Sequence, residues 1–402
     1  MKTDQTISHS MGGKTNLFLV AATICLFVCA EDAMGQITAE ITELNLNSGN
    51  NYNMKWGVDK RVIVAPQWVK DTTSEPVFYP MTSAINVCPK FELSEPWGSV
   101  AGTARVCATD TISGITVPVS STPIPAYATE FSIETQTIAH ADQLTDSMIG
   151  GETLNFNWKY SFDGGYTWQD AGTTSNFCYV TFDLPTAPWS TNGYDGIPVY
   201  VEMMDYACSA MSGATDEFSA IQKLTMGTAG FMIYHSTMHY TGGGYKDSLY
   251  VGEFVKDCNG YTSGPAEGDD CRDFSCVADS LGAAVGLDEK DVQIVAICRS
   301  VTPYWFSTRP VKPAGQSVSG ATNWAFHEVN YIPAPGTWMM SDGSLLLDGD
   351  DNDGNGWTSP GILANYDLDW DDYVYKLSTL TLAYIGYWDC CSLNEGIRPW
   401  AP

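Results

Sequence analysis

The chain has 402 residues, 44% of them hydrophobic, so it is long enough and apolar enough for two domains with buried cores. Its 47 acidic and 19 basic residues give a net charge of -28, which repels nucleic acid and attracts cations or a basic partner. This composition excludes an intrinsically disordered chain and argues against a nucleic-acid partner.

Residues 1–35 have the pattern of a secretory signal. Lys2 and Lys14 precede the apolar stretch 17–30, and a small-residue cleavage site ends at Gly35. An uncleaved anchor would use the same residues. No later segment is apolar over a bilayer-spanning length, so we expect a mature chain without a transmembrane span. We expect it to be secreted, periplasmic or at the cell surface.

Twelve cysteines are present, and export permits disulfides. We expect Cys88 to pair with Cys107, because both lie in strand-like segments. Adjacent Cys390 and Cys391 would need a strained turn to bond each other, so each is expected to pair elsewhere.

Residues 36–185 predict an all-β domain, an immunoglobulin-like β-sandwich. Its strands are predicted where β-branched and aromatic residues gather, at Ala84–Leu93, Thr103–Ala108, Ile115–Ser120, Glu130–Ile138, Leu154–Phe162 and Phe177–Phe182. Asp163-Gly164-Gly165 predicts a tight hairpin turn, because glycine accepts positive φ angles. Residues 186–200 are dense in turn formers and predict a linker.

Residues 201–402 predict a second domain of the α+β class. Helices are expected over Ala214–Met226 and from Asp269 or Asp270 to Gly286, where apolar residues recur at helical spacing. Strands are expected over 292–297, 324–332 and 338–340. Helices first and a sheet after them is the order of a packed α+β layer.

Cys271 is the first candidate for chemistry, because it falls in the first turn of the second of these helices. The helix dipole and unpaired backbone N–H groups there favour a thiolate. His327 lies in an apolar strand, and Asp342 follows on what is expected to be the adjacent antiparallel strand. The Asp342 carboxylate would then lie beside the His327 imidazole, where it would fix the tautomer of the neutral ring and stabilise the imidazolium.

The order and spacing of these residues resemble the transglutaminase-like group of papain-fold cysteine enzymes. The helix-opening motif is Asp270-Cys271-Arg272-Asp273-Phe274-Ser275, and Asp269 stands where that group commonly has Gly. His327 is followed eleven residues later by Trp338 and four residues after that by Asp342. The resemblance spans roughly residues 200–380 and implies an α+β transglutaminase-like (papain-fold) domain behind the sandwich.

The resemblance implies an exported cysteine hydrolase or acyltransferase that acts on amide bonds of a protein or peptide. Cys271 would attack the carbonyl, His327 would take and return the proton, and Asp342 would orient His327. The Cys271 amide would be one oxyanion donor, with Tyr261 as candidate for the second. Water as acceptor gives a peptidase or amidase, and an amine gives a protein-glutamine acyltransferase. No cofactor is required for this chemistry.

The alternatives are structural. Cys271 would then form a structural disulfide, since Cys258 and Cys276 are nearby in the sequence. His327 would be an ordinary core residue. The chain would be a non-catalytic surface-binding or structural protein with the same fold.

Two further patterns have the spacing of metal ligands, although for the first of them, the pair His235 and His239, lining of the Cys271 cleft is the favoured interpretation. His235 and His239 have i, i+4 spacing, but their neighbours favour loop or strand, where two such imidazoles do not converge on a zinc ion. Asp351, Asp353 and Asn355 match positions 1, 3 and 5 of a calcium loop, while Ile362 stands where a bidentate Glu belongs. The alternative for this segment is a solvated acidic loop, and structural calcium is the cofactor it would hold.

Overall fold

A computed structural model describes seventeen stretches of the chain. They are residues 37–46, 53–57, 61–144, 149–190, 197–232, 241–242, 248–258, 270–287, 293–299, 305–309, 311–317, 323–324, 326–334, 337–346, 365–378, 382–388 and 392–394. The predicted signal at residues 1–35 lies outside these stretches. Among the helices that are described, none has the length and apolarity needed to cross a membrane.

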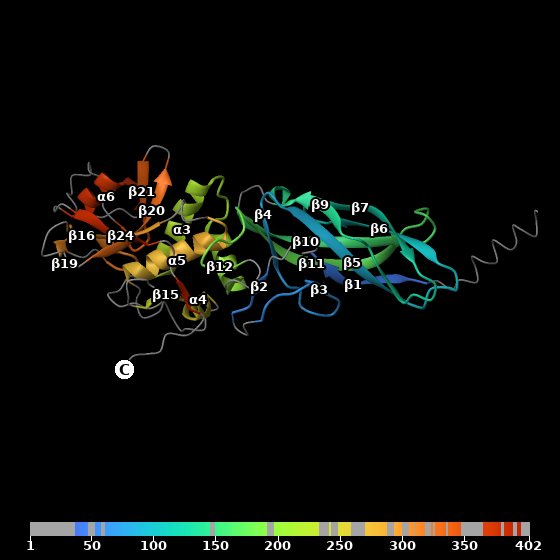
Figure 1. Cartoon of the computed structure of the whole chain (residues 1–402). Coiled ribbons are helices and arrows are strands. Elements are labelled where there is room, and N and C mark those ends of the chain that lie inside the picture. Colours follow the sequence, from blue (N-terminus) through green and yellow to red (C-terminus); the bar gives the residue numbers. More distant parts are fainter. Residues whose placement is uncertain are drawn as a thin grey trace, which may run out of the picture.

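Two five-stranded sheets form the blue-to-green end of the molecule (Figure 1). One sheet contains β3 (Trp68–Val69), β1 (Ala39–Asn45), β5 (Ala84–Leu93), β8 (Glu130–Ser132) and β9 (Gln136–His140). The other has the order β4 (Val77–Pro80), β11 (Gln169–Thr181), β10 (Gly150–Ser161), β6 (Gly102–Asp110) and β7 (Thr116–Ile124). A short 3-10 turn, Ala141–Gln143, follows β9.

The two sheets share one apolar core, which follows from the alternation of side chains along each strand. Strand β5 buries Ile85, Val87, Phe91 and Leu93. The ring of Phe91 stacks on Phe131 of its own sheet at 5.1 Å and meets the edge of Trp158 of the other sheet at 6.0 Å between centroids. Aromatic packing therefore joins the sheets.

The hairpin between β10 and β11 confirms the predicted turn. Gly164 and Gly165 have φ angles of 78° and 95°, which residues with a Cβ rarely adopt. The Asp163 carboxylate accepts hydrogen bonds from the Ser161 hydroxyl at 2.7 Å and from the Thr167 amide at 2.9 Å. The turn is thus fixed by backbone conformation and by a local side-chain acceptor.

A three-stranded sheet links this end of the molecule to the helices. Strand β13 (Ile197–Tyr200) pairs in parallel with β12 (Trp189–Ser190) and with β2 (Met54–Lys55). Helix α2 (Val201–Ala210) begins directly after β13 and packs on α3 (Glu217–Phe231), α4 (Val251–Cys258) and α5 (Cys271–Ala284). The Trp189 indole donates to Ser280 O of α5 at 2.7 Å, so the segment predicted as a linker is anchored to that helix.

Helix α5 lies against a five-stranded antiparallel sheet that curls as a half-barrel. Its order is β23 (Asn365–Asp369), β21 (Thr337–Asp342), β20 (His327–Ala334), β16 (Gln293–Arg299) and β24 (Leu382–Trp388). Helix α6 (Trp370–Leu377) follows β23 directly. A three-stranded sheet has the order β14 (Thr241–Gly242), β15 (Ser248–Tyr250) and β25 (Ser392–Asn394). Two two-stranded sheets pair β17 (Phe306–Ser307) with β19 (Asn323–Trp324), and β18 (Lys312–Pro313) with β22 (Leu345–Leu346).

The predicted fold class, an immunoglobulin-like sandwich followed by an α+β transglutaminase-like (papain-fold) domain, is wrong. The described chain is mostly β, with few helices, and strands recur from Ala39 to Asn394. The prediction gave too much weight to two segments with helical spacing. Most of the runs that surround those segments are short strands, and they pair into antiparallel sheets.

The predicted disulfide between Cys88 and Cys107 is also wrong, because both are free thiols. Cys88 lies on β5 and Cys107 on β6, and these strands belong to different sheets. The Cys88 thiol donates to Ile133 O at 3.2 Å. Burial raises the pKa of both thiols, so both stay protonated at neutral pH.

We expect Gly286→Ala to destabilise the protein by about 3 kcal/mol or more, because its φ is +88° and a Cβ would lie 2.5 Å from backbone atoms of Asp183. The matched control is Gly114→Ala, where φ is +75° and no atom lies within 4 Å of the new Cβ. Urea unfolding should show a cost of only about 1 kcal/mol for the control. Equal costs for the two variants would contradict the close approach of Gly286 to the backbone of Asp183.

Candidate active site

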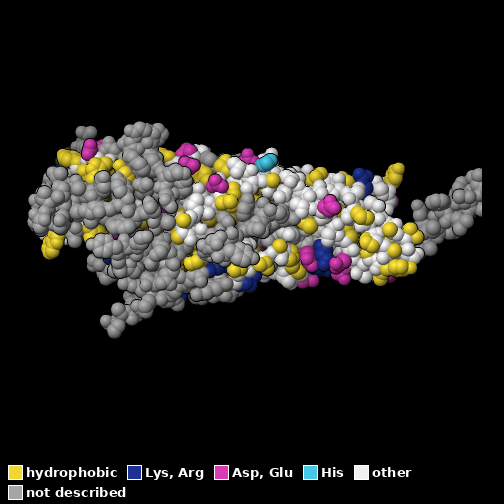
Figure 2. All heavy atoms as spheres, in the orientation of Figure 1, with side chains coloured by type: hydrophobic (Ala, Val, Ile, Leu, Met, Phe, Trp, Pro, Cys, Tyr) yellow, Lys and Arg dark blue, Asp and Glu magenta, His cyan; other side chains and the backbone are white. Residues whose placement is uncertain are grey.

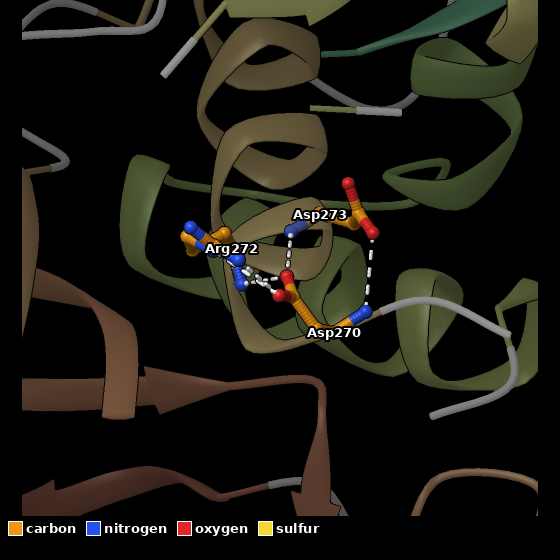
Figure 3. A network of polar contacts seen from close by, with 3 residues as sticks. All are labelled: Asp270, Arg272 and Asp273. Carbon is orange, nitrogen blue, oxygen red and sulfur yellow. Dashed lines mark hydrogen bonds and ion pairs between the residues drawn. The ribbon is translucent and has the colours of Figure 1, made fainter. Parts of the chain in front are cut away.

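The candidate site begins at the first turn of α5, which a capping box fixes (Figure 3). The Asp270 carboxylate accepts hydrogen bonds from the amides of Arg272 at 2.9 Å and Asp273 at 3.3 Å. The Asp273 side chain accepts from the Asp270 amide at 3.1 Å in return. These bonds satisfy amides that a helix start leaves unpaired, and they place Cys271 at the first helical position.

Arg272 ties this helix start to the strand that carries His327. Its guanidinium forms an ion pair with the Asp270 carboxylate at 2.8 Å (Figure 3). The same guanidinium lies 5.5 Å from the ring centroid of Phe326, the residue before His327. A cation over an aromatic face is attracted by the ring quadrupole, so Arg272 holds both segments together.

His327 is the first residue of β20 and is fully buried. Its Nε2 lies 3.0 Å from Asp342 Oδ2, and the Trp324 ring lies 4.9 Å from the imidazole between centroids. Within the described residues, Nδ1 of His327 has no hydrogen-bond partner. Antiparallel pairing of β20 with β21 brings His327 and Asp342 together, which confirms the predicted neighbourhood of the two residues.

The Asp342 carboxylate is surrounded by donors. Besides His327, it accepts from the Tyr373 hydroxyl at 2.5 Å, from the Ser344 hydroxyl at 2.6 Å and from the Ser344 amide at 2.9 Å. Burial acts to raise the pKa of Asp342, but the interactions with His327, Ser344 and Tyr373 outweigh it and hold the pKa below its ordinary value. Asp342 is therefore a carboxylate at neutral pH.

Sequence reasoning missed Tyr373 and Ser344. Tyr373 and Leu377 have the i, i+4 spacing of a buried helix face, and both are buried on α6. That spacing was the signal for a helix behind Asp342. Ser344 follows Asp342 by two residues, the usual position for a local side-chain bond in a turn.

Cys271 is a free thiol that is 6% exposed. Because Cys271 is free, the alternative of a structural disulfide through it is wrong. The disulfide-bonded cysteine on α5 is Cys276. The main-chain N–H of Glu328 donates toward the Cys271 sulfur, which places the thiol beside the residue that follows His327. In the part of the chain that is described, no hydrogen bond joins Cys271 Sγ to His327.

The prediction that the helix start makes Cys271 a thiolate is wrong for this conformation. Burial and then the carboxylates of Asp270 and Glu328 raise the pKa of the Cys271 thiol well above its ordinary value. The Glu328 amide and Arg272 lower that pKa, but not enough to reverse the effect. Cys271 is thus a neutral thiol that needs a base before it can attack.

The geometry supplies a base with a defined tautomer. An ionised Asp342 accepts a hydrogen bond, so Nε2 of His327 carries the proton and the lone pair resides on Nδ1. This lone pair has no partner within the described residues and is the acceptor that a thiol proton would require. The backbone amide of Cys271 also has no acceptor among the described residues, so it is available to a developing oxyanion.

The remaining candidates fall outside the described residues. These are Tyr261, the histidine pair His235 and His239, and the calcium-loop residues Asp351, Asp353 and Asn355. Within the described stretches, no group of three or more His, Cys, Asp or Glu side chains is arranged to hold a metal ion. His140, the other histidine described, lies exposed on β9, far along the chain from the site.

Comparisons with known proteins identify no family. No family model matches the chain, and no curated protein matches it. One similar solved structure is a family 123 glycoside hydrolase from Clostridium perfringens, studied for glycolipid glycan hydrolysis. It has 10% identity and a TM-score of 0.19, and the match covers 38% of this chain and 28% of that one. Another is a family 76 glycoside hydrolase from a bovine Bacteroides thetaiotaomicron strain, with 10% identity, a TM-score of 0.17, and coverage of 44% and 29%.

None of these comparisons supports the transglutaminase-like resemblance of the sequence. The chain spans less than a third of the two solved structures, and neither is a transglutaminase-like or papain-fold enzyme. The descriptions transglutaminase-like and cysteine protease are therefore withdrawn. The signal peptide at residues 1–35 and the calcium loop lie outside the described residues and stay predictions. TM-scores this low carry no argument about what this chain does.

We expect Asp342→Asn to destabilise the protein by about 3 kcal/mol at pH 7, because it removes the charged partner of several buried donors. The pKa of Asp342 is lowered in the folded state, so its stabilisation is fully present above the ordinary carboxyl value of 3.8 and is lost as pH falls through the folded value. The stability difference between wild type and Asp342→Asn should therefore shrink in acid. Urea unfolding across pH measures this, with the exposed Asp371→Asn as control. A difference that grows in acid would contradict the account.

Proposed function

We propose that this chain is a thiol hydrolase or acyltransferase that acts on amide bonds of proteins or peptides. The single observation that carries the proposal is the buried His327–Asp342 pair at 3.0 Å. The second ring nitrogen of His327 has no partner among the described residues, and a free thiol, Cys271, lies against the next residue of the strand. A buried ring nitrogen without a hydrogen-bond partner destabilises the folded state, so its presence calls for an explanation. A role in proton transfer supplies one.

The proposed reaction has two stages. In the first, Nδ1 of His327 accepts the proton of the Cys271 thiol, and the sulfur bonds to the carbonyl carbon of the substrate. The C–N bond then breaks, His327 gives its proton to the leaving amine, and a thioester remains on Cys271. In the second stage, water or a second amine attacks the thioester and restores the thiol. Asp342 stabilises the imidazolium in both stages.

Because Cys271 is a neutral thiol at rest, its proton would move to Nδ1 of His327 only after the substrate has bound. A substrate that enters the site displaces water and brings its carbonyl to the Cys271 amide, a donor without an acceptor in the described residues. Stabilising the oxyanion there makes sulfur attack favourable when His327 removes the proton. A thiol that is protonated at rest would also be protected from adventitious alkylation and oxidation.

A non-catalytic binding or structural role is the second candidate. The observation that favours it is the missing hydrogen bond between Cys271 Sγ and His327 in the described residues, together with the raised pKa of the thiol. Under this alternative, Asp342 and His327 serve only to hold β20, β21 and α6 together.

A chromogenic acyl donor distinguishes the two candidates. With p-nitrophenyl acetate, we expect a burst of p-nitrophenolate close to one equivalent per active chain, absent in Cys271→Ser. His327→Ala should slow the burst by about a hundredfold or more, because it removes the general base. The matched control is Cys107→Ser, which removes a free thiol on strand β6, far from the site in the chain, and should leave the burst unchanged.

A burst that persists in Cys271→Ser, or a wild-type rate in His327→Ala, would exclude the proposed enzyme and leave the non-catalytic role. Circular dichroism and thermal melting of each variant check that the fold is retained. Methylamine added during turnover then separates the two acceptors. N-methylacetamide as product indicates acyl transfer, and acetate alone indicates hydrolysis.

A further inference from the structure

A cavity of about 570 Å³ lies between the two five-stranded sheets at the β1–β11 end and the helices, apart from the residues of the candidate active site. Its walls come from the segment before β4, from β11, and from α2, α3 and the end of α4. Five of its lining residues are aromatic: Trp56, Phe177, Tyr179, Tyr206 and Phe231. Neither Cys271, His327 nor Asp342 is among the lining residues.

The aromatic rings of this cavity are held in fixed positions. Phe177 and Tyr179 pack edge to face at 4.8 Å between centroids, and Tyr206 and Phe231 do the same at 5.0 Å. The Trp56 indole N–H donates to Glu75 at 2.6 Å. Rings that are already fixed lose little entropy when a ligand binds, so the cavity is preorganised.

The polar atoms of these rings are already engaged within the protein. The Tyr206 hydroxyl donates to Gly227 O at 2.9 Å, and the Tyr179 hydroxyl donates to Asp205 at 3.5 Å. Burial raises the pKa of both tyrosines, so both are neutral phenols. What the rings have left to offer a ligand is their π-surface, which attracts cations.

The charged lining residues are acidic. Glu202 and Asp205 line the cavity, and none of the described lining residues is Lys, Arg or His. Asp205 is exposed, forms no ion pair within the described chain, and accepts only the long bond from Tyr179. Nearby Glu75 is neutralised by Arg61 at 2.7 Å, so it adds little to the field. Asp205 therefore places at the cavity a carboxylate that has no ion-pair partner among the described residues.

We propose that this cavity binds an organic cation whose alkylated ammonium group lies among the aromatic rings, with Asp205 as its counter-ion. Aromatic faces that meet a carboxylate suit a quaternary or alkylated ammonium, which is poorly hydrated and needs no directional hydrogen bond. On the face in Figure 2, acidic side chains are scattered over the described part, with Lys and Arg side chains among them. A net charge of -28 raises the local concentration of cations.

The test compares choline with 3,3-dimethylbutan-1-ol, in which carbon replaces the charged nitrogen, by isothermal titration of the full chain. We expect saturable binding of choline, and binding of the neutral alcohol that is weaker by about fivefold or more. Asp205→Asn should weaken choline binding by about fivefold while leaving the alcohol unaffected. Because Asp205 is exposed, this variant is expected to fold.

Two controls match these changes. Asp170→Asn removes an exposed carboxylate elsewhere on β11, and Tyr166→Leu removes an exposed aromatic ring in the hairpin, so both should bind choline as the wild type does. By contrast, Tyr206→Leu should abolish choline binding. The proposal is overturned if choline shows no saturable binding, if the alcohol binds equally well, or if Asp205→Asn and Asp170→Asn bind choline alike.

Discussion

Burial of helix α5 on all sides is the constraint on which the rest of this structure depends. Every residue of the helix except Arg272 is buried, and the helix packs against α2, α3, β16 and β20. In this position the first amides of the helix need partners within the protein, and the Asp270 carboxylate supplies one for the amides of Arg272 and Asp273. The Asp270–Asp273 capping box answers that need and fixes the point where the helix begins.

The same constraint determines the character of the candidate site. Because the start of α5 is enclosed, Cys271 is a neutral thiol in spite of the helix dipole, and the adjacent carboxylates add to this effect. Asp342 is enclosed as well, yet it remains charged because Tyr373, Ser344 and His327 all donate to it. One buried group is thus kept neutral and the other ionised, a difference that suits a proton transfer through His327.

Local patterns in the sequence were sufficient for individual elements. The strand predicted at 84–93 coincides with β5, and the predicted helix from Asp270 to Gly286 contains α5. Alternating burial and a capping signal are local properties, so a sequence displays them directly. The neighbourhood of His327 and Asp342 could also be predicted, because two consecutive antiparallel strands bring their ends together.

Sheet partners that lie far apart in the sequence could not be predicted in this way. Strand β13 pairs with Met54–Lys55, and no local signal in either segment reveals this. The donors around Asp342 and the protonation of Cys271 depend on such distant packing, which is why the fold class and the state of the thiol were predicted wrongly.

The most direct measurement is the location of the acyl group after a single turnover. Rapid quenching of the protein with p-nitrophenyl acetate, followed by proteolysis and tandem mass spectrometry, would identify which of the described free thiols carries the acetyl group. The account predicts acetylation of Cys271 alone, even though Cys88, Cys107 and Cys258 are less deeply buried. Acetyl groups distributed over the more accessible cysteines, with Cys271 unmodified, would contradict it.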